Sequence, residues 1–184
     1  MPSYQDQLVQ VLAVAFPEAP VKKEWAALSG EEAVYSPRID IAVGPFASGA
    51  HRFEAEFSDM LERHLVLLRR LHGHFQANAA SVDPAELVPD LVSMGRRNPN
   101  ARCFIALEIE ASGSRKHIMG GAVNAAALGR IGISVACSAE RLRALLKMRR
   151  YLLFLAEVGK NTFDPRNLMI LAKEQLDEAL EGLP

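Results

Sequence analysis

Apolar positions in the first part of the chain recur at helical spacing and then switch to a strand-like run. Val9, Leu12 and Phe16 repeat at helical intervals, and Pro17 ends that amphipathic helix. The segment 38–43 (RIDIAV) is rich in β-branched residues and precedes a Gly-Pro pair. This pattern predicts a strand that is closed by a turn.

The next stretch returns to helical periodicity. Phe57, Leu61, Leu68 and Phe75 share one side of a predicted helix over 53–75, with charged residues opposite. Asp83 precedes a proline, which predicts the N-cap of a new helix.

Strands and helices alternate in the second half. Apolar runs predict strands at 103–110, 131–137 and 167–172, and helices at 116–129 and from Ser138 to about 158 separate them. Gly129 is the expected C-cap of the first of these helices. A short helix closes the chain. Strands alternating with helices favour parallel connections, so we expect an α/β sandwich with a small mixed central sheet.

Length and composition agree with one domain over 1–184, with a core over about 31–172 and a helical insertion over about 52–98. The 184 residues are 49% hydrophobic and carry 21 basic against 22 acidic side chains, which excludes collagen-like and disordered classes. The near-zero charge conceals an asymmetry. Residues 1–92 hold 7 basic and 13 acidic side chains, whereas 96–150 hold 11 basic and 3 acidic ones, which favours a polyanionic partner.

The chain is expected to be cytoplasmic, without a membrane partner. Its first apolar run has no positive segment before it and no small-residue cleavage site, and no run approaches the ~20 apolar residues of a spanning helix. Cys103 and Cys137 lie in apolar segments, which predicts two buried, reduced thiols.

Three acidic residues interrupt otherwise apolar strands. Asp40 lies in RIDIAV, and Glu108 and Glu110 lie in FIALEIE. Side chains alternate along a strand, so Glu108 and Glu110 share a face. Carboxylates gathered there would repel one another unless a hard cation such as Mg²⁺ lay between them. The alternative is that Glu108 and Glu110 are simply solvated at an exposed strand end.

The order of these elements resembles the active-site layout of the PD-(D/E)xK nuclease superfamily. In that layout an Asp lies on one strand and an acidic pair on the next, and a helix and a buried strand follow. The resemblance covers about 38–136 and implies a restriction endonuclease-like α/β/α sandwich. Asp40 is similar to the metal-binding aspartate and Glu108 to the second acidic ligand. Glu110 occupies the position where the family usually has Lys, and Lys116 opens the following helix.

The resemblance implies metal-dependent phosphodiester hydrolysis of nucleic acid, with DNA as the expected substrate. Asp40, Glu108 and the Ile109 carbonyl would hold Mg²⁺ or Mn²⁺, and Glu110 would be a further ligand or would orient water. Lys116 would stabilise the charge that develops on phosphate. The missing Lys at position 110 leaves open a catalytically inactive relative.

Basic residues gather on the predicted helix that Ser138 opens. Arg141, Arg143, Lys147 and Arg150 are candidate phosphate contacts, and a solvated polar face is the alternative. The competing function is therefore a non-catalytic nucleic-acid-binding or protein-interaction module on the same fold. A small-molecule-binding protein ranks last because the chain shows no ligand motif. A homodimer remains open.

Overall fold

A mixed five-stranded sheet organises the computed structural model, which describes residues 3–28, 36–111 and 115–181. Its strands, in spatial order, are β1 (Val21–Ala26), β2 (Arg38–Val43), β3 (Cys103–Glu110), β4 (Gly129–Ala136) and β5 (Leu168–Ala172). The pairs β1–β2 and β2–β3 are antiparallel, whereas β3–β4 and β4–β5 are parallel. The predicted α/β class and mixed sheet are confirmed. Residues 31–35 of the predicted core lie outside the described ranges.

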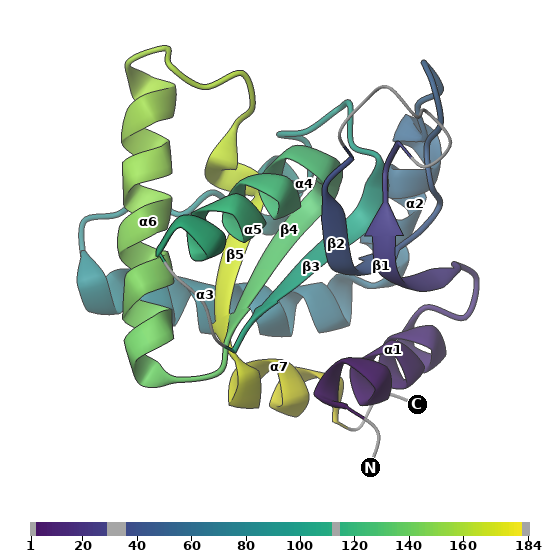
Figure 1. Ribbon diagram of the computed structural model, residues 1–184, viewed down its shortest axis with the longest axis horizontal. Helices are drawn as coiled ribbons and strands as arrows, with labels where there is room; N and C mark the ends of the chain where they lie inside the picture. The colour runs from purple at the N-terminus through teal and green to yellow at the C-terminus, as the bar shows by residue number, and fades with distance from the viewer. Residues whose placement is uncertain (1–2, 29–35, 112–114, 182–184) are drawn as a thin grey trace.

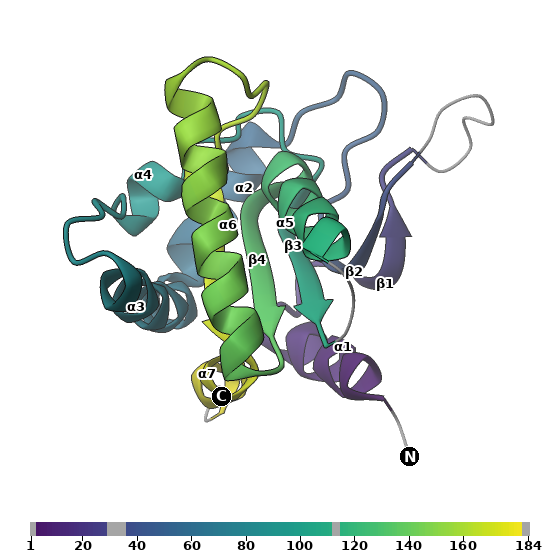
Figure 2. The same ribbon diagram turned by 60° about the vertical axis from the view of Figure 1, so that its left-hand side comes forward.

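Helices cover both faces of the sheet (Figures 1 and 2). Helices α5 (Arg115–Leu128) and α6 (Ala139–Glu157) lie on one face, and α2 (Glu54–Arg63) and α3 (Leu65–Val82) lie on the other. The remaining helices are α1 (Tyr4–Ala15), α4 (Leu91–Gly95), the 3₁₀ turn η1 (Pro165–Asn167) and α7 (Lys173–Leu180). In the described ranges, no helix has the length and apolar character needed to cross a membrane.

The two central strands form the middle of the core. Every residue of β4 is buried, and β3 is buried except for a half-buried Ile109. This burial on both faces explains the nearly continuous apolar runs of these strands. Cys103 is a buried free thiol, as predicted, but the free thiol of Cys137 is only half-buried.

The helix predicted over 53–75 is two helices that meet at His64. The backbone of His64 leaves helical geometry (φ −100°, ψ 20°), and its Nε2 lies 2.6 Å from Glu18 Oε1. The ring also packs against Phe16. The apolar spacing conceals this break because α2 and α3 bury the same side of the chain.

Asp83 ends a helix instead of starting one. It is the C-cap of α3, and its side chain accepts a hydrogen bond from the Ala85 amide at 3.0 Å. The next helix, α4, begins at Leu91, and Asp90 is its N-cap. An Asp before Pro favours turns as well as helix starts, so the local sequence does not separate the two outcomes.

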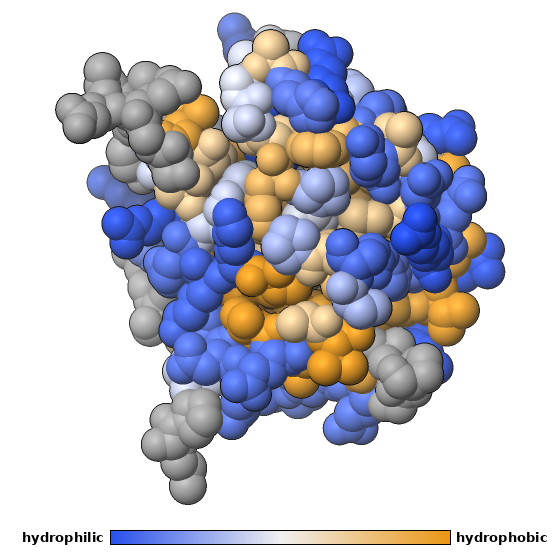
Figure 3. All heavy atoms as spheres, turned by 90° about the vertical axis from the view of Figure 1, so that its right-hand side faces the viewer, coloured by the Kyte–Doolittle hydropathy of each residue, from blue (hydrophilic) through white to orange (hydrophobic). Residues whose placement is uncertain are grey.

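Strand β1 was not predicted. Its central positions Lys22, Lys23 and Glu24 are exposed, and only Trp25 is buried, so the segment lacks the alternation that marks a strand. Charged residues on an edge strand oppose pairing with another chain. Figure 3 faces this edge and shows a mostly hydrophilic surface with an apolar group in its lower half.

The C-terminal end of α5 is capped by side chains, not by Gly129. Gly129 is the first residue of β4 and has no positive φ. The buried Asn167 Nδ2 donates to the carbonyls of Ala126 and Gly129, at 2.9 Å each. Asn98 Nδ2 donates to the same two carbonyls and to that of Ala127. Two asparagines that are distant in sequence therefore hold the junction between α5 and β4.

We expect Asn167→Ala to lower the free energy of unfolding by about 1–3 kcal/mol, because it removes a buried donor from two carbonyls. For a chain of this size the melting temperature should fall by roughly 2–12 °C. Asn100→Ala, at an exposed turn, is the matched control and should leave the melting temperature unchanged. Equal melting temperatures for the two variants would contradict this assignment.

Candidate functional site

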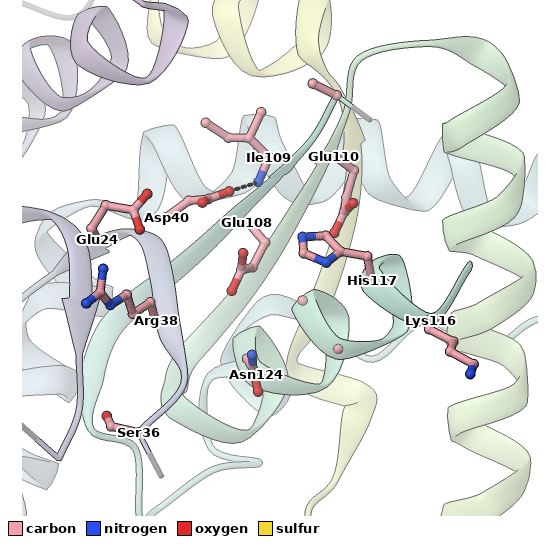
Figure 4. Close-up of a pocket in the computed structure, with 13 residues that line it drawn as sticks. Glu24, Ser36, Arg38, Asp40, Glu108, Ile109, Glu110, Lys116, His117 and Asn124 are labelled. Carbon is pink, nitrogen blue, oxygen red and sulfur yellow. Dashed lines mark hydrogen bonds between the residues drawn. The ribbon is translucent and has the colours of Figure 1, made fainter. Parts of the chain in front are cut away.

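Asp40 lies where the pairing of β2 with β3 ends. The last paired residues are Ile41 and Leu107, so the register places Asp40 opposite Glu108. Asp40 Oδ2 accepts a 2.7 Å hydrogen bond from the Ile109 amide (Figure 4). The carboxylate thus takes the place of the next hydrogen bond between the strands. The Asp40 carbonyl in turn accepts a 2.7 Å hydrogen bond from Gln5 Nε2 of α1.

Glu108 and Glu110 lie under α5 on the same face of β3, as their spacing predicts. A Cβ atom at Gly121 of α5 would lie 2.7 Å from Glu110 Oε1 and 3.6 Å from the Glu108 side chain. The two residues are only 7% and 3% exposed. The alternative that they are solvated at an open strand end is therefore wrong.

The Glu108 carboxyl is buried without adequate compensation. Its Oε1 has no hydrogen-bond partner among the described residues. Burial is the main cause that raises the pKa of Glu108 to about 9, and the charges of Asp40, Glu110 and Glu24 contribute to this shift. In the absence of a cation, this carboxyl is therefore protonated at neutral pH.

The neighbouring acids are perturbed in the same direction. Burial raises the pKa of Asp40, and the charge of Glu24 adds to this, while the Ile109 amide and the His117 ring oppose it. Burial also raises the pKa of Glu110, against the opposing charges of His117 and Arg141. Three carboxyl groups thus share one site in which their ionised forms are disfavoured.

These groups line an open cavity of about 600 Å³ between β1, β2, β3 and the first turns of α5, which we call the acidic cavity. Glu24 of β1 also lines it, with its backbone in the left-handed region (φ 50°), an uncommon conformation for a glutamate. Arg38 and Asn124 bring a cation and an amide to the lining. The contributions of Glu24 and Arg38 were not predicted, because they depend on β1 and on the β1–β2 pairing.

Two adjacent residues of α5 point in different directions. Figure 4 shows the His117 ring turned toward Glu110, whereas the Lys116 side chain leads away from the carboxylates. Lys116 still lines the cavity, with Gly120 and Asn124 following at helical spacing. His117 was not singled out from the sequence, although its position next to Lys116 in an Arg-Lys-His run is a usable signal.

The acidic cavity meets several chemical requirements of a hard-cation site. Its acids offer carboxylate oxygens, and one of these is buried without a partner in the part of the chain that the structure describes. The Ile109 carbonyl, an expected ligand, instead accepts a 3.3 Å hydrogen bond from the Ala111 amide. In the side-chain positions seen here, no three His, Cys, Asp or Glu residues within the described ranges are arranged to hold a metal ion. A bound cation would therefore require these side chains to move.

The predicted phosphate contacts of α6 divide into two groups. Arg141, Arg143 and Lys147 line a second cavity, between α5 and α6. Arg150 lies apart from them and forms an ion pair with Asp83 at 2.9 Å. Its neighbour Arg149 is buried and pairs with Glu86. Only the first three residues therefore share a surface.

We expect Gly121→Ala to displace the Glu110 carboxylate, because the new methyl group would lie 2.7 Å from Glu110 Oε1. Gly120→Ala is the matched control, since a Cβ there meets no atom within 4 Å. Replacing glycine in a helix by alanine stabilises by about 0.5–1 kcal/mol. Gly120→Ala should therefore raise the melting temperature, whereas Gly121→Ala should gain less or lose stability. Equal gains would contradict the close contact.

We expect Glu108→Gln to stabilise the metal-free protein at pH 8. A carboxyl whose pKa is about 9 when folded and about 4.3 when unfolded binds more protons in the folded state, so stability falls as pH rises through this interval. Glutamine removes that loss, and the gain of about 1 kcal/mol or more corresponds to about 2–4 °C. Melting in EDTA should show the gain shrinking at pH 5. Glu62→Gln, at an exposed position on α2, should show no gain, and a destabilised Glu108→Gln at pH 8 would contradict the assignment.

No protein-family model, curated protein or solved structure matches this chain. The acidic cavity and the surfaces around it are therefore the features that bear on its function.

Proposed function

We propose that this protein hydrolyses phosphodiester bonds of a nucleic acid, with DNA as its substrate, using Mg²⁺ or Mn²⁺. The observation that carries the proposal is the Glu108 carboxyl, which is 7% exposed and lies beside Asp40 and Glu110. One of its oxygens has no hydrogen-bond partner among the described residues. Burying neighbouring carboxyl groups costs free energy, because their ionised forms lose hydration and repel one another, and without a cation they must take up protons instead. A divalent ion supplies the compensating charge.

The order of elements supports the same proposal. Asp40 lies on β2, the acidic pair lies on the adjacent antiparallel strand β3, and α5 leads to the buried strand β4. This is the layout that a restriction endonuclease-like fold of the PD-(D/E)xK superfamily implies. The agreement extends to the neighbouring positions of Asp40 and Glu108, which lie 68 residues apart in the sequence.

Asp40, Glu108 and Glu110 would hold the ion, which when bound lowers the pKa of its water and neutralises charge on the phosphate. Other residues that line the cavity can bind the substrate or move a proton independently of the ion. The His117 ring faces Glu110, and an imidazole in this position can accept a proton from water or stabilise negative charge. The Asn124 amide can donate a hydrogen bond to a phosphate oxygen, and Arg38 places a cation at the rim.

His117 therefore takes the role that the resemblance gives to Lys116. The family position for lysine holds Glu110, and the Lys116 side chain leads away from the carboxylates. These two departures also favour the second candidate function, a non-catalytic nucleic-acid-binding or protein-interaction module. The two candidates differ in whether a bound ion leads to cleavage.

We expect Mg²⁺ or Mn²⁺ to raise the melting temperature. At one hundred times its dissociation constant, the ion should add about 2.7 kcal/mol to the free energy of unfolding. Asp40→Asn should abolish the shift and should also abolish cleavage of single-stranded and duplex DNA. The amide variant keeps an oxygen that can accept from the Ile109 amide, so the fold should persist. Asp59→Asn makes the same chemical change at an exposed position on α2 and should leave both properties intact.

The same assays separate the candidates. His117→Ala should reduce cleavage by about 100-fold, in the usual range for a proton-transfer group, whereas Lys116→Ala should reduce it much less. Metal stabilisation without cleavage of DNA or RNA would support the non-catalytic module. No metal stabilisation in the unmodified protein would overturn the metal site itself.

A further inference from the structure

A second cavity of about 800 Å³ lies between α5 and α6, beside the acidic cavity. Its lining combines three cations, an exposed aromatic ring, one acid and several apolar side chains. We call it the basic groove and define it by Arg141, Arg143, Lys147, Tyr151, Ile118 and Met119.

Two cations of the groove are not paired with acids among the described residues. Arg143 and Lys147 are exposed, and neither has a hydrogen bond or ion pair within the part of the chain that the structure describes. By contrast, Arg130 pairs with Glu54 at 2.6 Å and Arg150 pairs with Asp83. Glu140 is the acidic residue among those lining the groove. This surface is therefore complementary to a polyanion.

The cations continue into an aromatic stripe along α6. Arg143, Lys147 and Tyr151 are spaced by four residues and Phe154 follows three later, so all four lie on one side of the helix. Tyr151 is 48% exposed and Phe154 is 54% exposed. Contact with duplex phosphates needs cations alone, whereas unpaired bases also need apolar rings on which to stack.

The basic groove and the acidic cavity adjoin the same N-terminal part of α5. Consecutive residues of α5 divide between the two, with Lys116 and His117 in the cavity and Ile118 and Met119 in the groove. Arg141 lines the groove, and its charge acts on Glu110 in the cavity. A nucleic-acid strand bound along α6 would therefore lie near the carboxyl groups of the acidic cavity.

We propose that the basic groove binds a single-stranded nucleic acid, with phosphates on Arg143 and Lys147 and a base stacked on Tyr151. This inference rests on the proposed function, because it identifies the strand in the groove as the substrate of the acidic cavity. It restricts that substrate to single strands or to unpaired regions of a duplex.

Binding is measured separately from cleavage, by fluorescence anisotropy in EDTA with a labelled oligothymidylate and with the same strand annealed to its complement. The single strand should bind more tightly than the duplex. Arg143→Ala/Lys147→Ala should weaken single-strand binding at least tenfold. It should also reduce the magnitude of the slope of log K against log salt concentration by about 1.4. Tyr151→Leu should weaken binding about fivefold or more with no change in that slope.

Arg63→Ala/Arg69→Ala is the matched control, because it removes two exposed cations from α2 and α3 on the opposite face of the sheet. This variant should bind like the unmodified protein. Tighter binding of the duplex, or equal binding by the groove variants and the control, would overturn the inference. Groove-dependent binding without cleavage in Mg²⁺ would support the groove and overturn the nuclease proposal. Cleavage that is unaffected by the groove variants would support the nuclease proposal and overturn the groove.

Discussion

The backbone of helix α5 packs directly against the backbone of the sheet, and the acidic cavity depends on that contact. A Cβ atom at Gly132 of β4 would lie 2.8 Å from the backbone of Ala125, so only glycine allows this approach. The same closeness leaves Glu110 beneath Gly121, with no room for a side chain between them. Asn98 and Asn167 then fix the far end of α5 through the carbonyls that lead into β4. The helix both covers the carboxyl groups and presents His117 to them.

The energetic character of the site follows from the same packing. Burial beneath α5 and the proximity of other acids raise the pKa of Glu108 to about 9, and its Oε1 is left without a partner among the described residues. Such a group costs stability in the metal-free protein. Active sites commonly carry costs of this kind because their groups are arranged for a ligand or transition state and not for the folded chain alone.

The two helices on this face have complementary roles. Helix α5 brings His117 to the acidic cavity, and α6 carries the cations and the Tyr151 ring of the basic groove. The basic residues that cause the charge asymmetry of the sequence therefore include two classes. Arg130, Arg149 and Arg150 are held in ion pairs, whereas Arg143 and Lys147 remain exposed on the groove. A count of charges along the chain cannot separate these classes, because pairing depends on acids that are distant in sequence.

The sequence by itself determined the central elements and the shared face of two acids. Strands β2 and β3 match their predicted bounds, because apolar composition specifies a buried strand and alternation specifies its faces. It did not reveal β1, the break at His64 or the cap of α5, because each depends on long-range contacts that a local pattern does not encode. Only the tertiary structure decided that Asp40 lies opposite Glu108, that His117 faces the carboxyl groups and that Lys116 does not. These outcomes depend on strand register and on the rotation of α5 over the sheet, and both are set by packing between segments far apart in the chain.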